Sequence, residues 1–180
     1  MLKTTQLVAA FLLVLSGFAV ANTQWVLKEG TLTYHVSHPL HQTDGVSHAA
    51  RGKGVCHDGQ CDFLIAVPVK SFDSGDSNRD IHMVQVTRGA EFPMVSVRTR
   101  LAESAASSAT IQADLEIQFA GQIVHYKQVT FQLTKQGEET KITGTIPATL
   151  TDFKIEPPTL LTMPVKNEIP VHVEMTWRQQ

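Results

Sequence analysis

Apolar and polar residues alternate with a period of two along much of this chain, and this pattern most constrains its fold. From Ile111 to Phe119 every second residue is apolar, while Gln, Asp and Glu fill the positions between. The segments 95–101 and 171–177 follow the same pattern. A period of two places apolar side chains on one face of an antiparallel strand whose other face meets water. The sequence therefore predicts an all-β fold.

Further strands are expected at 31–38, 124–133 and 141–150, and along both arms of a hairpin that runs on to Val69. Helical periodicity is confined to a short stretch at 79–86, and four prolines interrupt the passage that ends at Pro170. About eight antiparallel strands in one domain form either a sandwich or a closed barrel. Composition alone does not choose between the two.

Residues 1–21 have the features of a secretory signal peptide. Lys3 precedes an apolar run from Leu7 to Val20, and Ala21 ends a small-x-small cleavage site. The run is shorter than the roughly 20 residues of a transmembrane helix, and no later stretch approaches that length. We expect residues 22–180 to form one periplasmic or secreted domain without a transmembrane segment. A retained N-terminal anchor is the alternative.

The charge balance argues against nucleic acid or an anionic membrane surface as a partner. Acidic residues outnumber basic residues by 17 to 15, and Lys3 is lost if the signal peptide is removed. Proteins that bind phosphate-rich partners carry basic surfaces. We therefore expect no nucleic-acid partner, and the sequence leaves the oligomeric state open.

The two cysteines, Cys56 and Cys61, flank a hairpin signal. Asp58-Gly59 between them suits a type I′ turn, which needs positive φ at both central positions. Such a turn places the two cysteines opposite each other, at a spacing that a disulfide bridges, and an exported protein meets an oxidising compartment. A metal or redox pair that uses His57 is the alternative, although two thiols and one imidazole leave zinc a ligand short.

Residues 71–83, SFDSGDSNRDIHM, carry three aspartates, one arginine and one histidine. An EF-hand beginning at Asp73 would require glycine sixth and glutamate twelfth, whereas glycine comes third and Val84 twelfth. The serines, glycine and asparagine are turn formers, and residues 76–78 could cap the short helix that follows. Arg79 and Asp80 can pair or hold neighbouring backbone. We interpret this segment as architecture before chemistry.

The order of these features resembles the YceI family, secreted lipocalin-like barrels named for binding polyisoprenoid lipids. The resemblance spans essentially the whole domain and rests on Trp25 with LTYHVSH, on SFDSGDSNRDIHM followed by FPMVSV, and on LEIQFAGQ and TDFKIEPP. Ala120 stands where the family commonly has histidine, and Cys56 and Cys61 lie outside its usual pattern. The loop VQVTRGAEF also lacks the paired aromatic residues that often follow the signature loop.

The resemblance implies a roughly eight-stranded lipocalin-like barrel with one or two short helices, holding a long isoprenoid-type lipid such as a quinone or polyprenyl chain, without a cofactor. Strand alternation supplies an uncharged inward set that would line the ligand or, equally, form a filled core. His38 shares this face, where it would donate to a lipid head group or be satisfied by backbone, and His82 is given a ligand-side role. The expected ligand-binding residues are Tyr34, Val36, His38, Ile65, Val67, His82, Val97, Leu115, Ile117 and Phe131, with Trp177 also inward.

We expect no enzymatic activity and no catalytic residues. The sequence contains no HExxH motif or phosphate loop, and no serine with a nucleophile-elbow glycine pattern. Histidines 35, 38, 41 and 48 crowd one segment, so a metal- or redox-accessory module is the alternative function. Solvated imidazoles in a surface loop are the simpler expectation, and no metal site is predicted. A binding module for a membrane or electron-transfer partner is compatible with the acidic surface.

Overall fold

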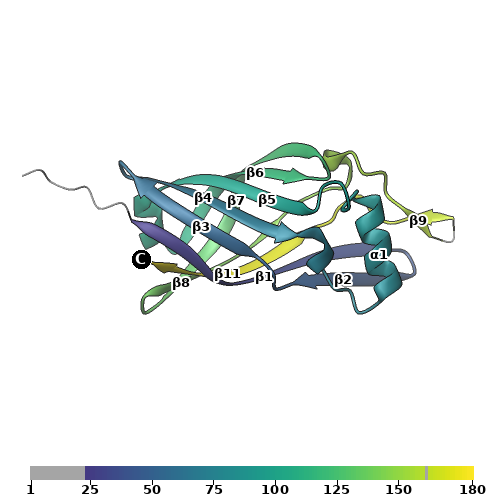
Figure 1. The fold of residues 1–180 in the computed structure, drawn as a ribbon, viewed down its shortest axis with the longest axis horizontal. Coiled ribbons are helices and arrows are strands. Elements are labelled where there is room, and N and C mark those ends of the chain that lie inside the picture. The colour runs from purple at the N-terminus through teal and green to yellow at the C-terminus, as the bar shows by residue number, and fades with distance from the viewer. Residues whose placement is uncertain (1–22, 161) are drawn as a thin grey trace, which may run out of the picture.

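Eight antiparallel strands close into a barrel in the computed structural model, which describes residues 23–160 and 162–180. Around the barrel the order is β1, β3, β4, β5, β6, β7, β8 and β11, and pairing of β11 with β1 completes the circle (Figure 1). The predicted signal peptide lies outside the described residues. The all-β prediction is confirmed, and the architecture is a barrel rather than a sandwich.

The strands match the predicted segments with shifted ends. The run predicted at 31–38 begins earlier, at Gln24, and the run predicted at 141–150 ends at Ile146, one residue before Pro147. A two-stranded ribbon of β9 and β10 lies in the proline-rich passage. In chain order the strands are β1 Gln24–His38, β2 His41–Ser47, β3 Arg51–His57, β4 Gln60–Pro68, β5 Met94–Ala102, β6 Thr110–Phe119, β7 Gln122–Gln136, β8 Glu139–Ile146, β9 Thr159–Leu160, β10 Met163–Pro164 and β11 Val171–Gln179.

Strand β2 corrects the expectation that the segment containing His41 is a surface loop. It pairs with the second half of β1, from Leu32 to His38, whereas β3 pairs with the first residues of β1. Its sequence, HQTDGVS, has no run of alternating apolar residues, because its inward positions are Gly45 and Ser47. The β1–β2 ribbon therefore continues beyond the point where β3 leaves β1.

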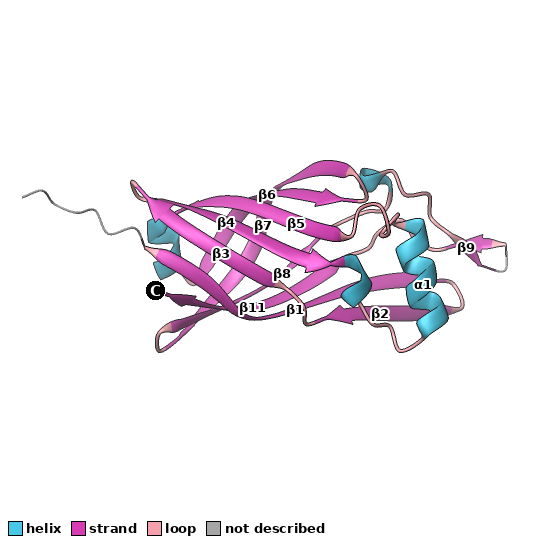
Figure 2. Cartoon of the chain, viewed as in Figure 1, coloured by secondary structure: helices cyan, strands magenta, loops and turns pink. Residues whose placement is uncertain are grey.

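The helix α1, Ser77–Val86, lies beside β2 at this end of the barrel (Figure 2). The Asp76 side chain caps it by accepting from the backbone N–H of Asn78 at 2.9 Å and of Arg79 at 3.1 Å. Arg79 donates to the Ser74 hydroxyl and carbonyl, and Asp80 accepts from the Ser74 N–H and hydroxyl. The segment 71–83 is thus architectural, as predicted. The 3₁₀ turns are η1 Val69–Ser71, η2 Glu103–Ser107 and η3 Thr151–Phe153.

The opposite end of the barrel carries the disulfide. Asp58 and Gly59 adopt φ of 50° and 75°, and the register places Cys56 directly opposite Cys61. The two cysteines are bonded, and both are buried. The predicted hairpin and bridge are confirmed. We call this end, which also holds η2 and the C-terminus, the disulfide end.

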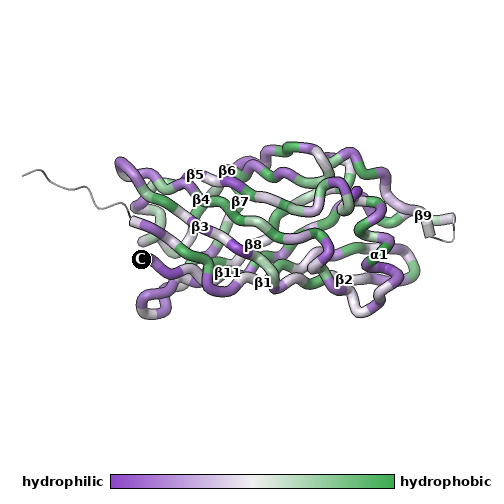
Figure 3. Tube along the Cα trace, viewed as in Figure 1, coloured by the Kyte–Doolittle hydropathy of each residue, from purple (hydrophilic) through white to green (hydrophobic). Residues whose placement is uncertain are grey.

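Hydrophobic and hydrophilic residues alternate along the strands (Figure 3), and the buried apolar residues form one core cluster. Within the described ranges no helix has the length and apolar character needed to cross a membrane.

The disulfide should contribute modestly to stability, because it closes a loop of only a few residues. Reduction should lower the free energy of unfolding in denaturant by about 2 kcal/mol on the chain-entropy account. The double variant Cys56→Ala/Cys61→Ala should show no response to reductant. A loss large enough to unfold the domain would show that the bridge holds more than the hairpin tip.

Candidate functional site

The inner wall of the barrel is apolar. Of the ten predicted ligand-binding residues, five are buried within it: Ile65, Val67, Leu115, Ile117 and Phe131. Tyr34, Val36 and Val97 also lie on inward positions and are partly buried. Trp177 is buried at the disulfide end. The wall that strand alternation predicts is therefore assembled, without charged side chains among these residues.

Three aromatic rings lie along this wall, each over a glycine of the neighbouring strand. Tyr34 is paired with Gly45, Phe63 with Gly54, and Phe131 with Gly144. A Cβ atom added to any of these glycines would come within 2.2 to 2.4 Å of the ring. Aromatic rings that fold over cross-strand glycines lie flat against the wall. This placement keeps three large side chains out of the centre of the barrel.

The interior is not uniformly filled. Three inward valines of β5 and β7, namely Val95, Val97 and Val124, retain partial exposure although they contact the core. At the disulfide end a cavity of about 40 Å³ lies among Trp25, Phe63 and Trp177. Pockets that enclose small-molecule ligands have volumes of roughly 300–1,000 Å³. A long chain would therefore extend from the accessible part of the interior toward this cavity and displace side chains on its way.

Tyr34 supplies a polar group at the α1 end of the interior. Its ring lies 5.5 Å from that of Phe72, and within the described residues its hydroxyl has no hydrogen-bond partner. Burial, and then the negative charge of Asp80, raise the pKa of this phenol, whereas Arg79 lowers it. The hydroxyl stays protonated and can donate to a neutral acceptor.

His38 is held by backbone. Its side chain is buried, Nδ1 accepts from the Leu40 N–H at 3.2 Å, and Nε2 lies 3.2 Å from the Met163 carbonyl. Because Nδ1 accepts, the ring proton is on Nε2 and donates to that carbonyl. His38 thus ties the end of β1 to β10. This geometry favours the backbone role over donation to a lipid head group.

The remaining candidate histidines are dispersed. His82 is exposed on α1 and is not brought to the inner wall. His35 faces Asp44, and His48 accepts or donates at the Thr31 hydroxyl. In the part of the chain that the structure describes, no group of three or more His, Cys, Asp or Glu side chains is placed to hold a metal ion. The histidine-rich segment therefore does not converge.

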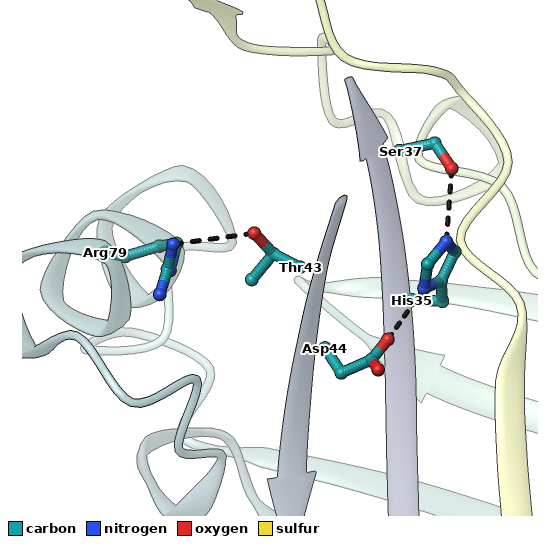
Figure 4. Close-up of polar contacts among 5 residues, drawn as sticks. All are labelled: His35, Ser37, Thr43, Asp44 and Arg79. Carbon is teal, nitrogen blue, oxygen red and sulfur yellow. Dashed lines mark hydrogen bonds and ion pairs between the residues drawn. The ribbon is translucent and has the colours of Figure 1, made fainter. Parts of the chain in front are cut away.

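Three polar side chains on the outer face of the β1–β2 ribbon are linked by hydrogen bonds that the sequence did not predict. His35 Nδ1 lies 2.6 Å from Asp44 Oδ1, and His35 Nε2 lies 3.2 Å from the Ser37 hydroxyl (Figure 4). The atoms are connected as in a serine-hydrolase triad. Ser37 lines neither the cavity near Trp177 nor the open hollow on the outer face of β3–β7. We interpret the linked side chains as a clasp between β1 and β2.

The sequence matches the YceI-like domain over residues 24–177, so the chain belongs to the YceI-like family. A polyisoprenoid-binding domain from Saccharophagus degradans, implicated in plant cell wall breakdown, is similar in structure, with a TM-score of 0.71 and 10% identity. That comparison covers 87% of this chain and 98% of the other. The matching sequence and structure confirm the predicted family.

Two further solved structures share the fold. Burkholderia cenocepacia BcnA has a TM-score of 0.69 and 13% identity, over 82% of this chain and 95% of its own. The YceI protein of Campylobacter jejuni has a TM-score of 0.53 and 11% identity, over 66% and 72%. A comparison with curated proteins gives no match. Identities this low establish the shared barrel and not a shared ligand.

Replacing His38 should loosen the β9–β10 ribbon. His38→Ala leaves the Leu40 N–H and the Met163 carbonyl without this partner, which should lower the free energy of unfolding by about 2 kcal/mol. Amide hydrogen exchange at 159–164 should become faster. The control His35→Ala removes an exposed contact with Asp44, which is worth less than about 1 kcal/mol. Equal effects of the two variants would contradict the role given to His38.

Both tyrosines of the chain should resist ionisation. Burial and the Asp152 carboxylate, which accepts from its hydroxyl at 2.8 Å, raise the pKa of Tyr126, as burial and Asp80 raise that of Tyr34. Tyrosinate absorbance of the folded protein should therefore appear above the ordinary value of 10.0. The folded state binds more protons than the unfolded state there, so stability should fall as the pH rises beyond this value. Titration of both residues at the ordinary value would contradict these placements.

Proposed function

We propose that this protein is an exported carrier that holds a long isoprenoid-type lipid, such as a quinone or polyprenyl chain, inside the barrel. The observation that carries the proposal is the uncharged inner wall, where apolar side chains stay partly accessible and three aromatic rings lie against glycines. A chain of methyl and methylene groups needs few polar contacts. The wall offers the contact area that such a chain requires.

The energetics favour a long chain over a small polar ligand. Burial of apolar surface contributes roughly 25 cal/mol per Å², or about 0.8 kcal/mol for each methylene group. Several isoprene units would therefore offset the cost of displacing inner side chains and of ordering the lipid. The Tyr34 hydroxyl supplies one donor for a neutral head group, such as a carbonyl, at the α1 end.

The family supports this ligand class. The Saccharophagus degradans domain that shares the barrel is described as polyisoprenoid-binding. The rings of His38 and His41 lie 5.1 Å apart, but among the described residues no group of three His, Cys, Asp or Glu side chains is placed to hold a metal ion. The histidine-rich segment therefore gives the metal- or redox-accessory alternative no support. The clasp of Ser37, His35 and Asp44 does not by itself define a substrate site. A binding role, without catalysis, remains the proposal.

Export to the periplasm or the exterior is part of the proposal. Residues 1–21 have the pattern of a signal peptide, with an apolar run and an Ala-x-Ala end. The Cys56–Cys61 bridge is compatible with an oxidising compartment. Amino-terminal sequencing of the protein from its native host should begin at Asn22.

An organic extract of the natively expressed protein should contain a neutral isoprenoid-type lipid close to one molecule per chain. Val97→Phe places a ring into the accessible part of the interior and should lower this ratio about tenfold. The matched control Arg98→Phe adds the same ring to the outer face of β5 and should leave the ratio unchanged. Mass spectrometry of the extract measures both. A lipid-free wild type, or equal ratios in the two variants, would refute the proposal.

A further inference from the structure

The ladder of hydrogen bonds around the barrel is incomplete between β5 and β6. It joins residues 96–98 of β5 to residues 116–118 of β6 and goes no further. Beyond this point β5 stays paired with β4 up to Ala102, and β6 is paired with β7 from Thr110 onward. The wall is therefore split toward the disulfide end, between residues 99–102 and residues 110–115. We call this gap the β5–β6 split.

One side-chain hydrogen bond crosses the split near its closed end, and the charged groups on the two edges do not cross it. The Thr99 hydroxyl donates to the Asp114 carbonyl at 2.8 Å, where a backbone ladder bond would otherwise form. Arg100 on the β5 edge donates two hydrogen bonds to Asp62 on β4, at 2.6 and 3.0 Å. The Asp114 carboxylate on the β6 edge accepts a hydrogen bond from Lys127 on β7 at 2.8 Å. The charged side chains of the two edges, Arg100 and Asp114, are opposite in sign. Each forms its ion pair with a strand on its own side of the split.

The split leads to the apolar cavity at the disulfide end. Leu101 on the β5 edge and Ile111 on the β6 edge both line this cavity. Ala105 and Ala106 of η2 also line it, from the segment that connects the two edges. No residue of η2 is buried, and residues 102–109 are alanines and serines apart from Glu103. This connection, which we call the flap, packs only Ala105 and Ala106 against the core, and two backbone hydrogen bonds hold its ends, from the Glu103 N–H to Gly59 and from the Leu133 N–H to Ala109.

The outer side of the split opens on a hollow in which exposed apolar side chains lie among charged ones. An open hollow of about 830 Å³ extends over the outer face of β3–β7 and is lined on both edges of the split, by Arg100 and Asp114 among others. Val55 and Leu64 lie in it, each 46% exposed. Phe63 borders both this hollow and the inner cavity. The hollow outside and the apolar cavity inside therefore both border the split.

We propose that the β5–β6 split is the route by which the lipid enters and leaves the barrel, with the flap 102–109 moving aside. The inference rests on the proposed function, since it concerns the same interior. Opening here breaks no backbone ladder between the two edges beyond Arg98 and Glu116; it breaks the Thr99–Asp114 bond and the two backbone bonds that hold the flap. At a fully laddered seam, such as β4 with β5 from Gln60 to Pro68, opening would break several more hydrogen bonds.

Cross-linking the split tests this route. In the double variant Arg100→Cys/Asp114→Cys a short bismaleimide linker joins the two edges, while the native cysteines stay protected in their disulfide. The control Arg98→Cys/Glu116→Cys carries the same linker between two residues that are already ladder partners. Uptake of all-trans-retinol, a fluorescent isoprenoid, is followed by stopped-flow fluorescence. Release is followed by transfer to vesicles.

The cross-linked Arg100→Cys/Asp114→Cys protein should take up and release retinol at least about tenfold more slowly than the control, with an unchanged equilibrium affinity, because gating alters rates and not end states. Equal rates in the two cross-linked proteins would overturn the route and leave the proposed function intact. Failure of the wild type to bind retinol would count against the proposed function as well as the route. Unlinked double variants should match the wild type.

Discussion

The pairing of β11 with β1 is the interaction on which the rest of the structure depends. It joins the two ends of the chain from Trp25 opposite Gln179 to Tyr34 opposite Val171 and turns an open sheet into a barrel. An open sheet would expose two unpaired edges and one apolar face. Closure gives the alternating residues an inside and an outside. The same alternation that specifies strands therefore also gives the closed barrel an apolar interior.

Much of the fold could be predicted because it is encoded locally. The alternation on β5, β6 and β11 identifies strands, and the Asp58-Gly59 turn sets the register that pairs Cys56 with Cys61. The cap at Asp76 is likewise a short-range signal. Resemblance to the YceI family then selected a barrel over a sandwich. The residues of the inner wall could then be predicted, because every second residue of a strand points to the same face.

Features that depend on contacts between distant segments could not be predicted in the same way. A register shift between Leu27 and Glu29 breaks the alternation, so the first part of β1 was missed. Strand β2 was missed because it faces inward with glycine and serine. The clasp of His35 with Ser37 and Asp44 depends on the register between β1 and β2. No spacing of residues in the sequence indicates that register. The β5–β6 split likewise appears only once the register of neighbouring strands is known.

Quenching of tryptophan fluorescence tests the central claim, occupation of the interior by an apolar chain, most directly. The two tryptophans of the chain, Trp25 and Trp177, both line the cavity at the disulfide end. A polyprenol brominated along its chain should strongly quench their emission at stoichiometric binding, whereas the unbrominated polyprenol should not. Binding of the brominated lipid without quenching would place the chain outside the barrel and contradict the account.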